Sequence, residues 1–269
     1  MLAVVRSARS ALERAPRIDA VTPAAAVCAV YVIGLAGAEV LLLTSGIAAG
    51  AVAHVALVLV LLLHATAVPD SPYRRMLMVL VLPSLIRLLG LTIPVAATPV
   101  AVWYLTAGTP ALLGALLVAR VTALPRSLYG RPASLPLQLL VGLTGITSGL
   151  LAYLVLRPQP VSTDLPVLVI SGVAVAVFAA VTEELVFRGS LQSVAADLFG
   201  SSAAGVGMST GLFALMYIGS QSVPFVLLML ATGLFLAWAV QQTGSLWGPM
   251  LAHAAMVVGL VVIWPVLLP

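Results

Sequence analysis

The sequence predicts an all-α protein, a polytopic transmembrane helical bundle with about eight or nine spans. Three observations support this fold class. Hydrophobic residues make up 62% of the 269-residue chain and charged residues only 7%, against roughly 25% charged residues in soluble domains. The mean hydropathy is +1.20. Nearly uncharged stretches of about 20 residues, the length that crosses a bilayer as a helix, follow one another along the chain.

About nine apolar segments are present, and each is expected to be a helix because an open strand cannot satisfy its backbone hydrogen bonds in lipid. Pro83 and Pro94 should bend or break the third segment. The seventh and eighth segments are separated by so few residues that they predict a tight helical hairpin. The approximate limits are 22–44, 47–67, 76–97, 99–119, 136–156, 165–187, 203–219, 222–241 and 245–268.

The basic residues, all of them arginine, predict how the chain is oriented. Four lie in the segment 1–20, and further clusters follow the second and fourth spans, whereas the connection 157–166 holds only Arg157 and Asp164. By the positive-inside rule, this pattern puts residues 1–20 in the cytoplasm. Because these clusters lie in short connections between helices, they indicate membrane topology and not nucleic-acid binding.

The chain divides into a motif-poor half, 21–157, whose helices have no assigned role, and a second half, 165–269, that carries the chemistry. No internal repeat relates the halves, which argues against an inverted-repeat transporter. A transporter also needs a polar pathway through several spans, and only Glu39, Arg87 and one acidic pair are available. Glu39 and Arg87 are costly in lipid, so we expect them to pair or to line a cavity.

The acidic pair stands in the stretch EELVFR, which ends a long apolar run. Glu184 and Arg188 are four residues apart and share one helix face, with the acid before the base, which is the favourable order. Glu183 is turned by about 100° from Glu184. The spacing therefore predicts that Arg188 holds Glu184 while Glu183 points elsewhere. Charges this costly should face the bundle interior or a wet cavity.

EELVFR resembles the Glu-Glu-x-x-x-Arg signature of the CPBP family, the CAAX-protease and bacteriocin-processing (Abi) proteins of the membrane. Two later motifs of that family, Phe-x-x-x-His and His-x-x-x-Asn/Asp, correspond to FALMY at 213–217 and HAAMV at 253–257. The lead-in QQTGSLWGPMLAHAA is also similar to the family. Two positions depart from the pattern: Tyr217 replaces the second-motif histidine, and Val257 replaces the third-motif Asn/Asp.

The resemblance implies an integral membrane endopeptidase, in the plasma membrane of a prokaryote, that uses activated water to cut a membrane-associated protein or peptide on the cytoplasmic side. Glu183 would be the general base or a metal ligand, and Arg188 would hold Glu184. His253 would be a metal ligand or, together with Tyr217, an oxyanion stabiliser. Zn²⁺ or another divalent metal would be held by Glu183 and His253. Three protein ligands are usual for a catalytic zinc, so a reaction of water without metal stays open.

The two departures also favour an alternative, a catalytically impaired pseudoprotease that serves as a membrane scaffold or regulator. The intact EELVFR stretch and His253 favour the enzyme. Other polar and aromatic residues are given structural roles. His54 and His64 are ten residues apart, about 80° around a helix, so one metal should not bind both. Trp103 and Tyr104 are assigned to an aromatic belt at a span end.

Overall fold

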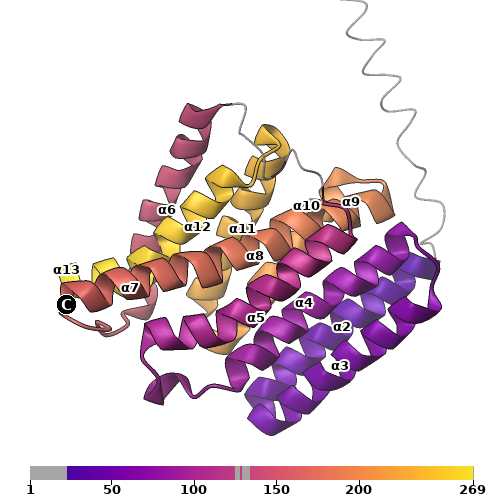
Figure 1. Ribbon diagram of the computed structural model, residues 1–269, viewed down its shortest axis with the longest axis horizontal. Helices are drawn as coiled ribbons and strands as arrows, with labels where there is room; N and C mark the ends of the chain where they lie inside the picture. The colour runs from indigo at the N-terminus through magenta and orange to yellow at the C-terminus, as the bar shows by residue number, and fades with distance from the viewer. Residues whose placement is uncertain (1–22, 125–127, 129–133, 269) are drawn as a thin grey trace, which may run out of the picture.

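The computed structural model describes residues 23–124, 128 and 134–268, and this part of the chain is helical throughout its regular elements (Figure 1). The predicted cytoplasmic segment 1–20, with Arg126 and Arg131, lies outside the described residues. The α-helices are α2 (Pro23–Thr44), α3 (Ile47–Ala67), α4 (Pro72–Leu91), α5 (Val100–Val121), α6 (Leu135–Leu156), α7 (Leu165–Val175), α8 (Thr182–Glu184), α9 (Gln192–Phe199), α10 (Ser202–Leu215), α11 (Val223–Thr243), α12 (Trp247–Val258) and α13 (Trp264–Leu267).

Five short segments complete the described chain. Two are 3₁₀ turns, η1 (Val95–Ala97) and η5 (Ile218–Ser220), and three are π-helical, η3 (Ala176–Val181), η4 (Leu185–Leu191) and η6 (Gly259–Ile263). Three α-helices and two π segments join without a break into one helix of 35 residues, from Leu165 to Phe199.

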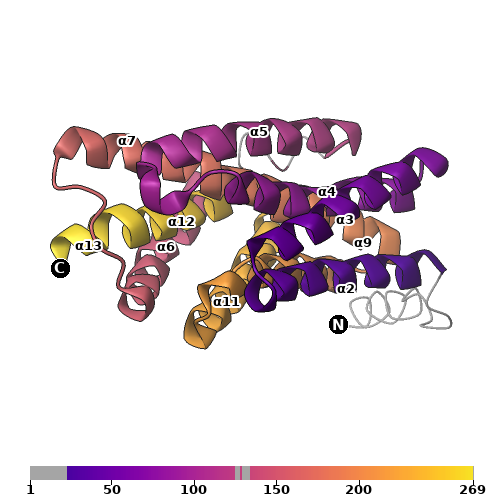
Figure 2. The same cartoon turned by 90° about the horizontal axis from the view of Figure 1, so that it is seen from below.

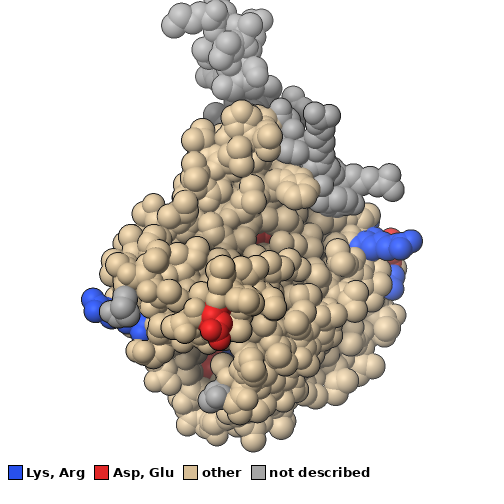
Figure 3. Space-filling view, turned by 60° about the vertical axis from the view of Figure 1, so that its left-hand side comes forward, with Lys and Arg blue, Asp and Glu red and all other residues tan. Residues whose placement is uncertain are grey.

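Eight helices of the described chain are long and apolar enough to cross a membrane. This number confirms the predicted all-α transmembrane bundle, and the protein is an integral membrane protein. The face in Figure 3 is mostly uncharged, with basic side chains toward its left and right sides and an acidic side chain near its centre. Large aliphatic side chains such as Ile33, Leu63 and Leu165 are 69–70% exposed, which is the expected surface of a helix that faces lipid.

The third predicted segment corresponds to α4, which lies in the interior of the bundle and is not among these eight helices. Its run from Met76 to Ser84 is almost wholly buried, and α3 and α5 pack against it. The predicted limits 76–97 are wrong at both ends. Ser71 caps the helix by accepting a hydrogen bond from the amide of Arg74, which sets an earlier start. The helix ends at Leu91, three residues before Pro94, and Pro83 is accommodated inside it.

The long helix Leu165–Phe199 runs between two groups of helices (Figures 1 and 2). On one side, α2 packs against α3 and α3 packs against α4. Helix α5 lies between α4 and the long helix. Helices α6 and α12 form the closest pair on the other side. The predicted hairpin of the seventh and eighth segments is present as α10 and α11, which pack together through the η5 turn. The long helix therefore contacts both halves of the chain.

Glycine permits the close approach of α6 and α12, and this gives a first prediction. A Cβ atom on Gly145 would clash with the carbonyl oxygen of Ala252, a backbone atom that cannot turn away. Gly145→Ala should therefore lower the free energy of unfolding by about 1–3 kcal/mol, the usual cost of overpacking. Unfolding in mixed detergent micelles measures it. Gly37→Ala and Gly211→Ala, where an added Cβ meets nothing within 4 Å, are matched controls without this loss.

Candidate active site

The acidic pair lies in the middle of the long helix, at a local change of helix type. Thr182, Glu183 and Glu184 form the single α-helical turn α8, with the π segments η3 and η4 on either side. A π segment shifts the direction of the side chains that follow it and is frequent at functional sites. Glu183 and Glu184 point about 100° apart on this turn, and each enters different surroundings.

Glu184 is enclosed in a charged network inside the bundle. Its Oε1 atom accepts a hydrogen bond of 2.9 Å from Nη1 of Arg188, and both side chains have no exposed surface. Nη2 of Arg188 donates to the carbonyl of Gly233 on α11. The guanidinium also lies 4.0 Å from the centre of the Phe213 ring, a cation–π contact. The predicted Glu184–Arg188 pair is therefore present and has contacts from two further helices.

His253 joins the same network from α12. Its Nδ1 atom is 2.8 Å from Oε1 of Glu184. An ionised carboxylate only accepts hydrogen bonds, so we assign the proton to Nδ1. Nε2 then points toward Glu183, whose Oε2 atom is 3.9 Å away. Glu184 thus fixes both the orientation and the tautomer of the imidazole ring.

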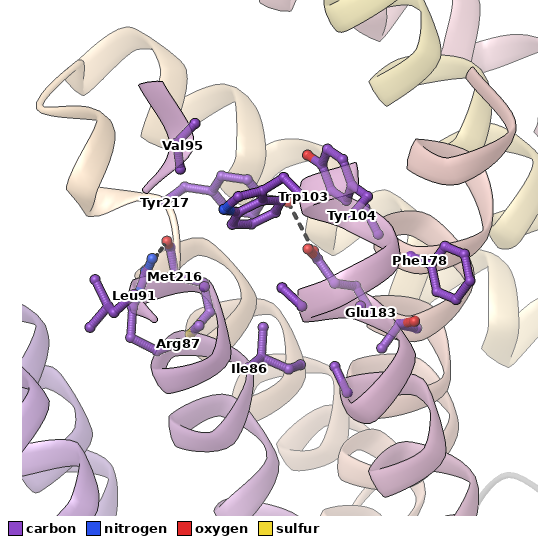
Figure 4. Close-up of a pocket in the computed structure, with 16 residues that line it drawn as sticks. Ile86, Arg87, Leu91, Val95, Trp103, Tyr104, Phe178, Glu183, Met216 and Tyr217 are labelled. Atoms are coloured by element: carbon purple, nitrogen blue, oxygen red, sulfur yellow. Dashed lines mark hydrogen bonds between the residues drawn. The ribbon is translucent and has the colours of Figure 1, made fainter. Parts of the chain in front are cut away.

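Glu183 points the other way, into a cavity of about 370 Å³. Its side chain is 20% exposed, and Oε2 accepts a hydrogen bond of 2.8 Å from the hydroxyl of Tyr217. Figure 4 shows the two side chains facing each other across this cavity. The structure therefore brings Glu183, Tyr217 and His253 together, with one carboxylate open to the cavity and the other closed off.

Most of the cavity wall comes from the N-terminal half of the chain, which the sequence left without a role. Trp103 and Tyr104 of α5 line it (Figure 4), whereas the sequence predicts that both residues belong to an aromatic belt at the membrane surface. Arg87 of α4 lines it as well. In the sequence, Arg87 is unusual only because it is a charged residue inside an apolar span. No local signal could have paired these residues with Glu183, because they are about 80 to 95 positions away in the sequence.

Arg87 is held by a second buried polar cluster. Its Nε atom donates to Oε1 of Glu39 at 2.7 Å, and its Nη2 atom donates to the carbonyl of Met216, the neighbour of Tyr217. His54 completes the cluster by bonding Ser84 and approaching Glu39 to 3.5 Å. The predicted pairing of Glu39 with Arg87 is confirmed. Through it, helices α2, α3 and α4 contact the segment that carries Tyr217.

The two departures from the family motifs have different surroundings. Tyr217 is the direct partner of Glu183, so a phenol hydroxyl now occupies the place next to the carboxylate. Val257 lies one turn after His253 on α12, is 8% exposed, and belongs to the apolar core. Its position therefore offers no polar group to a substrate.

The described residues do not hold a preassembled set of three protein ligands for a zinc ion. No group of three His, Cys, Asp or Glu side chains suited to a metal occurs among the described residues. Oε1 of Glu184 is engaged by both Arg188 and His253, whereas Oε2 of Glu184 and Nε2 of His253 are buried without a hydrogen-bond partner. His64 bonds Tyr31 and Tyr73, whereas His54 bonds Ser84.

Comparison with known proteins supports the resemblance noted in the motifs. Residues 165–259 match the sequence model of a family described as type II CAAX prenyl endopeptidase Rce1-like. No curated protein and no solved structure matches the chain. The matched segment contains all five residues of the predicted site: Glu183, Glu184, Arg188, Tyr217 and His253. Over this C-terminal segment, which holds the whole predicted site, the chain is similar to the Rce1-like type II CAAX prenyl endopeptidases.

Proposed function

We propose that the protein is an intramembrane endopeptidase of the CAAX type, which cuts a membrane-associated protein or peptide with water activated by Glu183. One observation carries the proposal: of two adjacent carboxylates, Glu184 is fully buried and paired, whereas Glu183 faces a cavity large enough for part of a polypeptide. A general base must have its carboxylate within reach of the attacking water and the substrate. Glu183 meets this condition and Glu184 does not.

In the proposed reaction, Glu183 removes a proton from water as the water oxygen bonds to the carbonyl carbon of the scissile peptide. The carbon–nitrogen bond then breaks, and the protonated Glu183 returns that proton to the leaving amine nitrogen. Tyr217 donates to Glu183 before substrate binds, and its hydroxyl also lies on the cavity wall. From there it can turn to the carbonyl oxygen and stabilise the negative charge that develops on it.

His253, Glu184 and Arg188 position these groups. His253 is fully buried and is not part of the cavity wall, so we assign its Nε2 atom a role beside Glu183 and not in direct contact with substrate. Glu184 and Arg188 hold the imidazole ring. No step is routed through a metal, because the described residues do not assemble a group of three ligating side chains. Elemental analysis of the purified protein tests the predicted zinc or other divalent ion.

A second function, that of a pseudoprotease scaffold, is supported by the surroundings of Tyr217 and Val257. The hydrogen bond from Tyr217 occupies Oε2 of Glu183, so this oxygen must exchange partners before it can accept a proton from water. The apolar Val257 supplies no further polar group for the oxyanion. In this case the cavity would bind a polypeptide without cutting it.

Purified protein in lipid nanodiscs should be tested against membrane-tethered peptides, prenylated and unprenylated, with Glu183→Ala beside the wild type. Cleavage that depends on Glu183 supports the endopeptidase. Retention of the peptide by wild type without cleavage supports the scaffold. Cleavage that is equal in both proteins contradicts the proposed site.

The phenol of Tyr217 gives a separate prediction. Tyr217→Phe removes the hydroxyl and keeps the ring, which packs edge-on against Phe213 and Phe225. We expect kcat to fall about 10²-fold, as for loss of one oxyanion donor, with a much smaller change in KM. Single-turnover cleavage measures it. A rise in kcat would mean instead that the hydrogen bond only restrains Glu183.

A further inference from the structure

Tyr217 lies in a turn, outside the regular part of any helix. Helix α10 ends at Leu215, and η5 begins at Ile218. The amide of Tyr217 donates to the carbonyl of Ala214 at 3.0 Å, which is a turn bond and not an α-helical one. The place of its hydroxyl beside Glu183 therefore depends on what holds this turn.

The carbonyl of Met216 is the point at which the turn is held. The last carbonyls of a helix have no partner within the helix, so other groups must supply hydrogen bonds to them where they are buried. Nη2 of Arg87 donates to the carbonyl of Met216 (Figure 4). The helix dipole also favours a cation at this end of α10. Because a peptide unit is planar, a fixed Met216 carbonyl fixes the plane that contains the amide of Tyr217.

Arg87 is itself held by a buried cluster from three helices. Its Nε atom donates to Oε1 of Glu39 at 2.7 Å, and Glu39 is buried. Nε2 of His54 lies 3.5 Å from the same oxygen, and its Nδ1 atom is 3.0 Å from the hydroxyl of Ser84. Ser84 precedes Arg87 by three residues and shares its face of α4. The guanidinium therefore has little freedom to move away from Met216.

The hydrogen bond from Tyr217 to Glu183 tolerates little displacement of the turn. Its length is 2.8 Å, within the range of about 2.5–3.0 Å for bonds between oxygens. The Tyr217 ring packs edge-on against Phe213 and Phe225, but the centroids of such pairs range over about 4.5–7 Å. These contacts alone do not fix the distance to Glu183. A misplacement of about 1 Å breaks the hydrogen bond, and a shift of this size can cost about 10²-fold in rate.

We infer that Arg87 is a positioning residue of the candidate site, which holds the turn at Met216 so that the hydroxyl of Tyr217 lies beside Glu183. The buried cluster around Glu39 keeps Arg87 in place. Helices α2, α3 and α4 thereby have a role in a site whose motifs lie elsewhere in the chain. The placement of Tyr217 follows from these contacts alone, whereas its effect on cleavage rests on the proposed function.

Fluorine NMR tests the placement of Tyr217 without requiring activity. The six tyrosines of the chain are replaced by 3-fluorotyrosine, and the signal of Tyr217 is the one that Tyr217→Phe removes. Glu183→Ala supplies the reference signal of a phenol without its acceptor. The test variant combines Glu39→Gln with Arg87→Met, which breaks the contact with Met216 and leaves no unpaired buried charge between the two positions.

In this double variant, we expect the Tyr217 signal to move toward its position in Glu183→Ala, because the hydroxyl loses its carboxylate partner. Arg87→Lys, which keeps a charge beside Glu39 but not the planar fork that reaches two acceptors, should shift it in the same direction and serves if the double variant does not fold. Arg157→Met, at an exposed connection, should leave the signal unchanged. An unchanged Tyr217 signal in a folded Arg87 variant overturns the inference.

Cleavage kinetics separate the positioning role from direct contact with a ligand. Arg87 also lines the cavity and is 23% exposed, so a ligand in the cavity can reach it. A positioning residue acts through Tyr217: the double variant should lose up to about 10²-fold in kcat, with KM near that of wild type, and nothing further in a Tyr217→Phe background. A loss of equal size in both backgrounds overturns the positioning role, as does a rise in KM with kcat unchanged.

The two measurements also separate this role from the proposed function. If the wild-type protein cuts no peptide, the proposed function fails, and the fluorine signal of Tyr217 alone decides whether Arg87 positions it. If the wild type cuts and the double variant equals it in both rate and fluorine signal, Arg87 has no positioning role and the endopeptidase stands.

Discussion

Replacement of Glu183 by glutamine should lower kcat by about 10²–10⁴-fold, the range that general-base catalysis contributes. The amide keeps the shape of the side chain and an oxygen that can accept the hydrogen bond from Tyr217. It cannot take a proton from water. Since Glu183 is partly exposed to the cavity, loss of its charge should change the stability little. Single-turnover cleavage of a tethered peptide and unfolding in mixed micelles measure the two effects.

The matched control for this variant is Asp164→Asn, which removes one negative charge from an exposed position at the start of α7. Its cleavage rate should equal that of wild type. If Glu183→Gln retains the wild-type rate under the same conditions, Glu183 is not the base, and the proposed mechanism is wrong. A large fall in stability would mean that the carboxylate has a structural role.

The helices were predictable because lipid leaves few alternatives. In a chain with so few charges, runs of apolar residues must become helices that satisfy their own backbone, and eight spans follow from that rule. The pairs Glu184–Arg188 and Glu39–Arg87 were predictable for a related reason: isolated charges are costly in the membrane interior, so each seeks a partner of opposite sign. Helical spacing identified the first pair, and scarcity of charges identified the second.

The division of roles within the site was only partly predictable. The sequence separated Glu183 from Glu184 by their directions on a helix, but it did not reveal that Nδ1 of His253 bonds Glu184. That contact depends on how α12 packs beside α8, and on π segments that a 3.6-residue period does not describe. The cavity wall from α4 and α5 also depends on packing between distant segments. Whether residues 21–157 and 165–269 act as separate units stays a prediction.

Replacement of Arg188 by methionine should lower the free energy of unfolding by about 3–5 kcal/mol, the usual cost of breaking a buried ion pair. Arg188 is the largest fully buried side chain of the described residues, so methionine also leaves its volume partly unfilled. The main loss is electrostatic: the carboxylate of Glu184 would keep His253 as a partner but lose the permanent positive charge at 2.9 Å. Unfolding in mixed micelles measures the change, with Arg157→Met at the exposed connection as a control that should be near neutral.

A double-mutant cycle distinguishes the charge effect from lost packing. Glu184→Gln alone removes the negative charge and leaves the charged guanidinium of Arg188 buried, with Gly233 and Phe213 as its further contacts. Glu184→Gln combined with Arg188→Met leaves no unpaired charge between these two positions. The double variant should therefore lose less stability than the sum of the single losses, by about 0.5–3 kcal/mol, as for residues in one network. Additive losses would mean that Arg188 stabilises the bundle through packing, and that Glu184 is held mainly by His253.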